Sequence, residues 1–205
     1  MDGVLIDSEP KYFSVLQEYV RSHGVVPNKV DFNHYIGTSD EAGWKMLISD
    51  EAQRENLRAG YYKYRRLHPI SYKDILKPGV EALLESLRAN GFKVALASAT
   101  ADDLVQRMLN ECHIKEYFSL VISGESVRRN KPAPDIYLET MRRLGVGAED
   151  CLVIEDSKNG IASDKAAGIE TWAITHTDYT VDQSKADRVV SGMDEIRELL
   201  TQNNK

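Results

Sequence analysis

Five short, largely apolar runs alternate with amphipathic segments of helix length over the last two-thirds of the chain. The apolar runs are residues 92–97, 119–122, 151–154, 170–174 and 186–190. The helical segments are residues 80–90, 104–109, 136–144, 160–167 and 193–200. Strands that alternate with helices and that are apolar on both faces form parallel sheets covered on both sides. Because crossovers between parallel strands are right-handed, the pattern predicts an α/β fold with a doubly wound parallel sheet.

The segment before this region has a different pattern. An amphipathic helix is predicted before Gly24, and residues 25–70 are polar and helical without a strand-like run. We therefore expect a small helical domain, residues 9–71, inserted into an α/β core domain. The core domain is expected to consist of residues 1–8 and 72–205.

Composition narrows the choice of partners. With 42% hydrophobic and 28% charged residues, the 205-residue chain has the composition of a globular protein. Its net charge of −6 argues against binding to duplex nucleic acid or to anionic lipid, because both need a basic surface. No apolar run approaches the ~20 residues of a membrane span, and Cys112 and Cys151 lack the spacing of a redox motif. We expect a cytoplasmic monomer that binds neither nucleic acid nor membranes.

Four polar segments carry the residues from which a site could be built. They are Asp2-Gly3-Val4-Leu5-Ile6-Asp7, Ser98-Ala99-Thr100, Lys131 and Glu155-Asp156-Ser157. Each has an ordinary structural explanation by itself: an Asp-Gly turn, a helix cap at Thr100, a solvated lysine and a polar loop. Two of the segments directly follow predicted strands, however, and ligands of parallel sheets bind at the carboxyl ends of strands. We therefore expect all four segments to gather at one edge of the sheet.

Together and in this order, the four segments resemble the four motifs of the haloacid dehalogenase superfamily. The longer stretches that carry the resemblance are DGVLIDSEP, LKPGVEALLESLRANGFKVALASAT, KPAPDIYLETMRRLGV and EDSKNGIASDKAAG. They are most similar to the β-phosphoglucomutase-like phosphatase branch. The resemblance implies that the helical insert is a cap domain. It also implies Mg²⁺-dependent phosphoryl transfer from a small phosphorylated metabolite.

The resemblance also implies a metal site. Asp156 would be the direct ligand of Mg²⁺, with Glu155 assisting, and Asp2 would contribute its main-chain carbonyl. Carboxylates are ligands that Mg²⁺ prefers. The Asp2 side chain would act as general acid on the leaving oxygen and would later activate water.

A phosphate-binding site is implied beside the metal. The Ser98 hydroxyl and the Ala99 amide would donate to the transferring phosphoryl group, and Gly3 would line the same site. Lys131 would balance negative charge between the phosphoryl group and the nucleophile.

The nucleophile of the family is an Asp two residues before the position of Asp2, and this position precedes Met1. We expect the native gene to encode about seven to nine further residues, an ordinary strand length, ending in that Asp. Without this strand, residues 92–97 and 151–154 would lack their shared neighbour. The chain as given is expected to be inactive as a phosphatase and poorly stable.

Two departures from the sugar-phosphate mutases of this branch favour hydrolysis. Tyr12 stands where the mutases have a His, and Asp40 stands where they have an Arg that holds a second phosphate. A phosphomutase remains the alternative of the same class. A binding protein that keeps the fold without catalysis is the alternative of another class.

The remaining polar and aromatic residues are expected to be structural. The histidines do not have the spacing of a metal-binding motif. They are His23, His34, His68, His113 and His176. The tyrosine- and arginine-rich residues 61–66 could suggest stacking on nucleic acid bases. A helix with its aromatic rings turned inward and its cations in water is the preferred interpretation.

Overall fold

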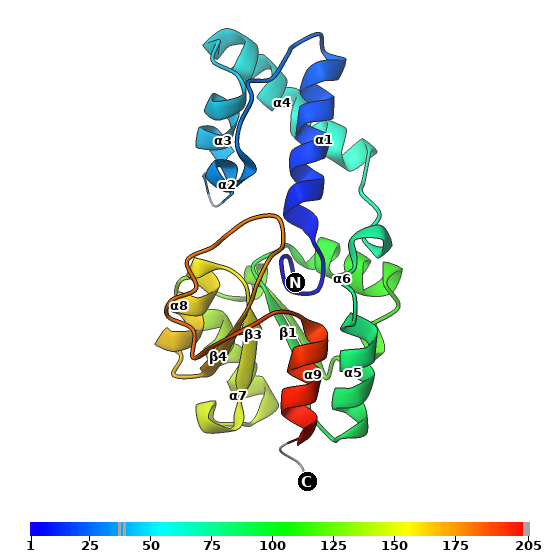
Figure 1. Cartoon of the computed structure of the whole chain (residues 1–205), viewed down its shortest axis with the longest axis vertical. Coiled ribbons are helices and arrows are strands. Elements are labelled where there is room, and N and C mark those ends of the chain that lie inside the picture. The colour runs from blue at the N-terminus through cyan, green and yellow to red at the C-terminus, as the bar shows by residue number, and fades with distance from the viewer. Residues whose placement is uncertain (37, 39, 203–205) are drawn as a thin grey trace. The chain divides into compact units, whose positions relative to one another are not determined.

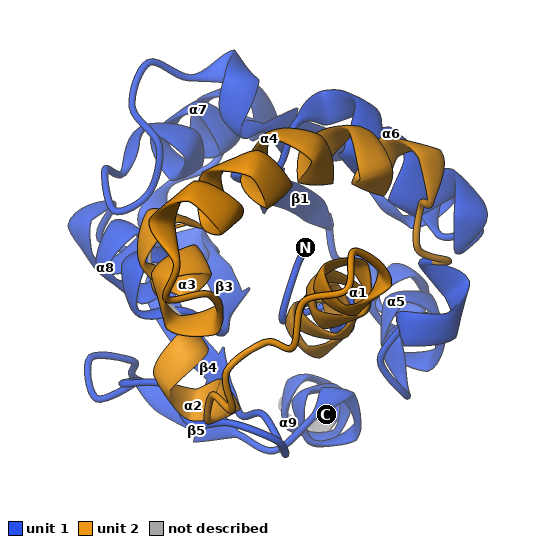
Figure 2. Ribbon diagram, turned by 90° about the horizontal axis from the view of Figure 1, so that it is seen from above, with its two compact units in different colours: residues 1–7, 72–205 blue, residues 8–71 orange. Residues whose placement is uncertain are grey.

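A computed structural model of the chain describes residues 1–36, 38 and 40–202. The described chain divides into two compact units, coloured separately in Figure 2. The first unit consists of Met1–Asp7 and Tyr72–Lys205, and the second is Ser8–Ser71. Gly37 and Ser39, which shortly precede Asp40 in the sequence, lie outside the described residues.

The first unit contains the predicted parallel strands. They are β1 (Ala95–Ser98), β2 (Leu120–Ser123), β3 (Leu152–Glu155), β4 (Glu170–Ile174) and β5 (Arg188–Val190). Every pair of these strands is parallel: β1 with β2, β3 with β4, and β4 with β5. The predicted α/β class with parallel strands is therefore confirmed.

These strands form two sheets. One has the order β1-β2 and the other β3-β4-β5, so β1 and β3 are each an edge strand among the described residues. The two strands that were predicted to lack a shared neighbour are thus unpaired with each other. The strand of residues 92–97 also begins later than predicted. The Phe92 N–H donates to the Leu87 carbonyl at 3.0 Å, so this residue completes the end of the preceding helix before the sheet begins.

Five helices belong to the first unit within the described part of the chain. They are α5 (Val80–Ala89), α6 (Asp102–Glu111), α7 (Asp135–Leu144), α8 (Lys158–Ala166) and α9 (Met193–Gln202). Helix α7 contacts β1 and β2, α8 contacts β3 and β4, and α5 packs against α9 (Figure 1). Short 3-10 turns cover Lys73–Ile75, Lys115–Tyr117, Gly124–Ser126 and Ala148–Asp150. None of the helices described for this chain has the length and apolar character needed to cross a membrane.

One part of the core of the first unit forms where α7 lies on the strands. Ile122 of β2 and Ile136 and Tyr137 of α7 are buried together with Ile169. This packing fixes the start of α7, and thereby the segment just before it that carries Lys131.

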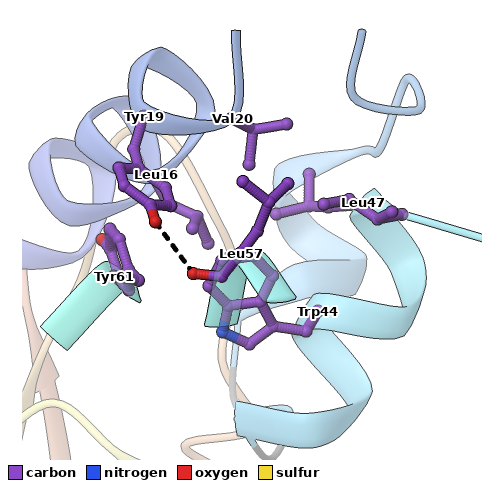
Figure 3. Packing of buried hydrophobic residues seen from close by; sticks show 8 residues of the cluster. Leu16, Tyr19, Val20, Trp44, Leu47, Leu57 and Tyr61 are labelled. Atoms are coloured by element: carbon purple, nitrogen blue, oxygen red, sulfur yellow. Dashed lines mark hydrogen bonds between the residues drawn. The ribbon is translucent and has the colours of Figure 1, made fainter. Parts of the chain in front are cut away.

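The second unit is helical, with α1 (Ser8–Ser22), α2 (Phe32–Tyr35), α3 (Asp40–Leu47) and α4 (Glu51–Leu67). Figure 3 shows its apolar core, in which the Tyr19 hydroxyl donates to the Leu57 carbonyl at 3.0 Å. Tyr61 lies in this core with its ring edge-on to Trp44 at 5.5 Å. Its neighbour Tyr62 is 50% exposed. The inward orientation predicted for the aromatic rings of residues 61–66 therefore holds for Tyr61 and fails for Tyr62, because adjacent residues of a helix do not share a face.

Candidate functional site

The turn after Asp2 is shaped around the carboxylate of Asp156. Gly3 has a φ of +69° and its N–H donates to the Ile6 carbonyl at 2.9 Å. A Cβ atom at Gly3 would overlap the Asp156 carboxylate, which lies against the turn. Only glycine meets both requirements, since it tolerates positive φ and has no side chain. The Asp-Gly pair thus brings the start of the chain to the loop after β3.

The end of β1 contacts the same turn through Thr100. The Thr100 hydroxyl donates to Asp2 Oδ2 at 2.7 Å, and its N–H donates to Ser98 Oγ at 3.2 Å. The ordinary structural explanation for Thr100, a cap of the next helix, does not apply: the N-cap of α6 is Ala101, without a side-chain hydrogen bond. The physical reason is that the hydroxyl is used by Asp2, 98 positions away in the sequence.

Ala99 lies beside the loop that carries Lys131. A Cβ atom at Gly124 would stand 2.5 Å from the Asn130 side-chain oxygen and 2.7 Å from the Ala99 carbonyl. The glycine therefore allows the loop after β1 and the loop before α7 to approach each other closely. The second and third motifs meet at this point.

Lys131 forms a buried ion pair with Glu155 at the end of β3. Their side chains are 12% and 7% exposed, and Lys131 Nζ also donates to the Tyr137 hydroxyl at 2.6 Å. The second carboxylate oxygen of Glu155 accepts from the N–H groups of Asp156 at 2.9 Å and Ser157 at 3.1 Å. Burial opposes ionisation of Glu155, but the charge and hydrogen bond of Lys131 outweigh it and hold the pKa of this carboxyl well below its usual range.

These contacts bear on how the site could hold a metal. Both oxygens of Glu155 are already hydrogen-bonded, so any help to a metal from this residue would be indirect. The Asp156 side chain is 15% exposed and lies against the Asp2-Gly3 turn, whose main chain offers further oxygen atoms. One carboxylate with main-chain, water and substrate oxygens fits the coordination habits of Mg²⁺. Among the described residues, no three His, Cys, Asp or Glu side chains come together as a complete metal site.

Several residues with contacts at this site were not predicted as site residues. Besides Thr100 they include Tyr137, His176 and Gln183, which contact Glu155 or Asp156. One signal could have revealed His176, which had been expected to be structural: it follows the apolar run 170–174 by two residues. Strand ends are where ligand sites of parallel sheets form.

Asp164 of α8 has a buried carboxyl group, and the residue is 0% exposed. Burial, with the negative charge of Glu155 adding to it, raises the pKa of Asp164 from 3.8 to about 7. The folded state therefore holds a proton that the unfolded state releases near pH 4. The stability that this proton contributes is present at low pH and is lost as the pH rises through about 7. Each pKa unit corresponds to ~1.4 kcal/mol, so the rise from 3.8 to about 7 corresponds to a loss of roughly 4 kcal/mol.

We expect Asp164→Asn to remove this part of the pH dependence. The free energy of unfolding, measured by urea titration between pH 4 and pH 8.5, should decline less steeply with pH in the variant than in the wild type. Asp178→Asn, at an exposed position, is the matched control and should keep the wild-type slope. An unchanged slope in Asp164→Asn would show that another group causes the decline.

The first unit has a doubly wound α/β fold. The polar and charged residues of the site lie at the carboxyl ends of β1 and β3. A family model described as haloacid dehalogenase-like hydrolase matches residues 1–174. The chain belongs to this family, and it is an enzyme by that resemblance, as the sequence motifs predicted.

Individual relatives agree with this assignment. A phosphorylated carbohydrates phosphatase of Thermotoga maritima is 31% identical over 180 residues, which cover 86% of this chain and 83% of the relative. A phosphoglycolate phosphatase of Aquifex aeolicus is 28% identical over 174 residues, with coverage of 83% and 80%. A crystal structure from Thermotoga maritima, assigned as a β-phosphoglucomutase, has a TM-score of 0.79 at 29% identity and covers 98% of this chain and 96% of that one.

Proposed function

We propose that this protein is a Mg²⁺-dependent hydrolase of small phosphate monoesters that works through an aspartyl-phosphate intermediate. The observation that carries the proposal is the convergence of four segments, two of which directly follow β1 and β3. The Asp2-Gly3 turn contacts Thr100 after β1 and Asp156 after β3, while Lys131 pairs with Glu155 next to Asp156. An anionic phosphate ester needs carboxylates, cations and hydroxyl donors close together, and these segments supply all three.

The roles follow from the chemistry of each group. The Asp156 carboxylate and the Asp2 main-chain carbonyl would hold Mg²⁺. The positive charge of the cation would offset the negative charge of the phosphoryl oxygens. The Asp2 side chain, held by the Thr100 hydroxyl, would give a proton to the leaving oxygen and take one from the attacking water.

The transferring phosphoryl group would be bound by the neighbouring donors. Ser98 Oγ and the Ala99 N–H would donate to its oxygens, and Gly3 would leave room for it. Lys131, fixed in place by Glu155 and Tyr137, would supply a positive charge that does not need to be reoriented during the reaction.

The nucleophile in this proposal is an Asp two residues before Asp2, which the sequence as given does not contain. Attack of this carboxylate on phosphorus would break the ester bond and form the aspartyl-phosphate. Attack of water would then release inorganic phosphate and restore the carboxylate.

Residues 8–71 would act as the cap domain of the family, and two of their contacts bear on the choice between hydrolase and mutase. Asp40 is paired with Arg58 at 2.6 Å, and the Arg65 guanidinium lies 4.0 Å from the centre of the Tyr12 ring. The positions at which the mutases have Arg and His are thus occupied by an acid and a phenol, each held by an arginine of α4. We infer that these positions are not arranged to hold a second phosphate for return to the product.

The names of the relatives support hydrolysis more than transfer, since phosphatases of phosphorylated carbohydrates and of phosphoglycolate are among them. A mutase remains the second candidate, because the similar structure from Thermotoga maritima is assigned to that activity.

The test uses a chain in which an apolar strand ending in Asp precedes Met1. We expect this chain to release inorganic phosphate from small monoesters in the presence of Mg²⁺, measured over a panel of phosphorylated sugars and acids. Conversion of a sugar 1-phosphate to the 6-phosphate with little release of phosphate would contradict hydrolysis and favour the mutase. Binding of the esters without either reaction would favour the non-catalytic alternative.

A further inference from the structure

His176 lies two residues beyond the end of β4, beside the carboxylate of Asp156. Its Nε2 atom is 3.2 Å from Asp156 Oδ2, and its side chain is only 3% exposed. Water therefore has little access to this contact, and the hydrogen bond is made in surroundings where it is stronger than at the surface.

The other ring nitrogen determines which way this hydrogen bond runs. His176 Nδ1 lies 3.5 Å from Lys77 Nζ. An ammonium group can only donate, so the Nδ1 atom that faces it must accept. In a neutral imidazole the proton is then on Nε2, which donates to Asp156. The main chain of Lys77 is itself held in place, because the main-chain N–H of Lys77 donates to the Leu5 carbonyl at 2.9 Å.

The ring is also fixed in its plane. It stacks on Tyr179, with 4.0 Å between the ring centres and 19° between the planes. Gln183, farther along the same segment, donates through Nε2 to the main-chain carbonyls of Asp156 and Ile174, each at 2.8 Å. The segment of residues 175–183 therefore holds both the side chain and the main chain of Asp156.

We propose that His176 is a positioning residue that orients the Asp156 carboxylate for a divalent cation, an inference that rests on the proposed function. A carboxylate on the first residue of a loop can rotate about two side-chain bonds, and each alternative rotamer would turn its oxygens away from the cation. The hydrogen bond from Nε2 restricts that rotation before the cation binds, and the absence of a Cβ atom at Gly3 leaves room for the carboxylate in this orientation. Preorganisation of this kind lowers the entropic cost of binding. Gln183 assists by fixing the main chain from which the carboxylate projects.

The experiment measures cation binding to the chain as it stands, without any reaction. Mn²⁺ is titrated into the protein and followed by EPR of the free ion, and Mg²⁺ is then added as competitor. We expect His176→Phe, which keeps a ring to stack on Tyr179 but has no nitrogen, to raise the dissociation constant about 10–100-fold. His176→Gln can still donate from its amide and is expected to stay closer to the wild-type value. His34→Gln, at an exposed position in the other unit, is the control and should not change the constant.

A second measurement separates positioning from a general contribution to folding. In the wild type, the ¹⁵N chemical shifts of His176 should show the proton on Nε2, and the Nε2–H signal should move when Mg²⁺ is added. A merely structural histidine would show no response to Mg²⁺. If His176→Phe does not fold, Gln183→Leu leaves the ring in place and is expected to weaken binding by about 10-fold.

The outcomes distinguish this inference from the proposed function. If Asp156→Asn binds Mn²⁺ as tightly as the wild type, Asp156 is not a ligand, and both the metal site and the role of His176 are overturned. If Asp156→Asn loses binding while His176→Phe and Gln183→Leu bind like the wild type, the metal site stands and the positioning role is overturned.

Discussion

A chain with an apolar strand ending in Asp before Met1 should hydrolyse phosphate monoesters about 10⁴-fold faster, or more, than the same chain with Asn at that position. The two extensions have the same length and nearly the same shape, so they differ only in the carboxylate that would attack phosphorus. An amide is a far poorer nucleophile, and the later steps cannot proceed without the covalent intermediate. Steady-state release of inorganic phosphate measures the difference.

The structure gives this experiment an internal control. Strands β1 and β3 are edge strands of separate sheets in the described part of the chain, so either extension can offer backbone hydrogen-bonding groups to both. About five buried apolar residues contribute ~1.5–3 kcal/mol each, so both extensions should raise the thermal midpoint to a similar degree. Equal activity of the Asp and Asn chains would contradict the proposed nucleophile and would make Asp2 or Asp7 the next candidates.

Asp156→Asn is expected to abolish Mg²⁺-dependent turnover of the Asp-extended chain. The substitution replaces one charged oxygen by an amide nitrogen, which cannot ligate a hard cation. The loss of the negative charge also removes the electrostatic attraction that draws the cation to the site. Phosphate release measured across a range of Mg²⁺ concentrations should show no recovery at high Mg²⁺, because the negatively charged ligand is missing.

The control for this prediction is Asp178→Asn, which lies at an exposed position of the loop after β4. It has the same change in net charge as Asp156→Asn and should leave turnover unchanged. Retained activity in Asp156→Asn, with normal dependence on Mg²⁺, would show that the cation is held elsewhere.

The sequence alone was sufficient to predict the parallel α/β unit and its strand-end motifs, because these features are encoded in local patterns. The apolar run that became β3 is continuous, and parallel strands buried on both faces have this pattern. The placement of Asp2, Ser98, Lys131 and Glu155 near one another followed from a general rule about strand ends and not from any local signal.

Tertiary structure decided how those residues are held. Thr100 and Asp2 are 98 positions apart, and Lys77 and His176 are 99 apart, so no periodicity links them in the sequence. The hydrogen bonds of Glu155 are a further example, since both of its oxygens accept from Lys131, Tyr137 or main-chain N–H groups. Whether a polar side chain faces water or a partner depends on which loops the sheet brings together. That information exists only once distant segments are packed, which is why the sequence indicated the chemistry of the site and the fold determined its hydrogen bonds.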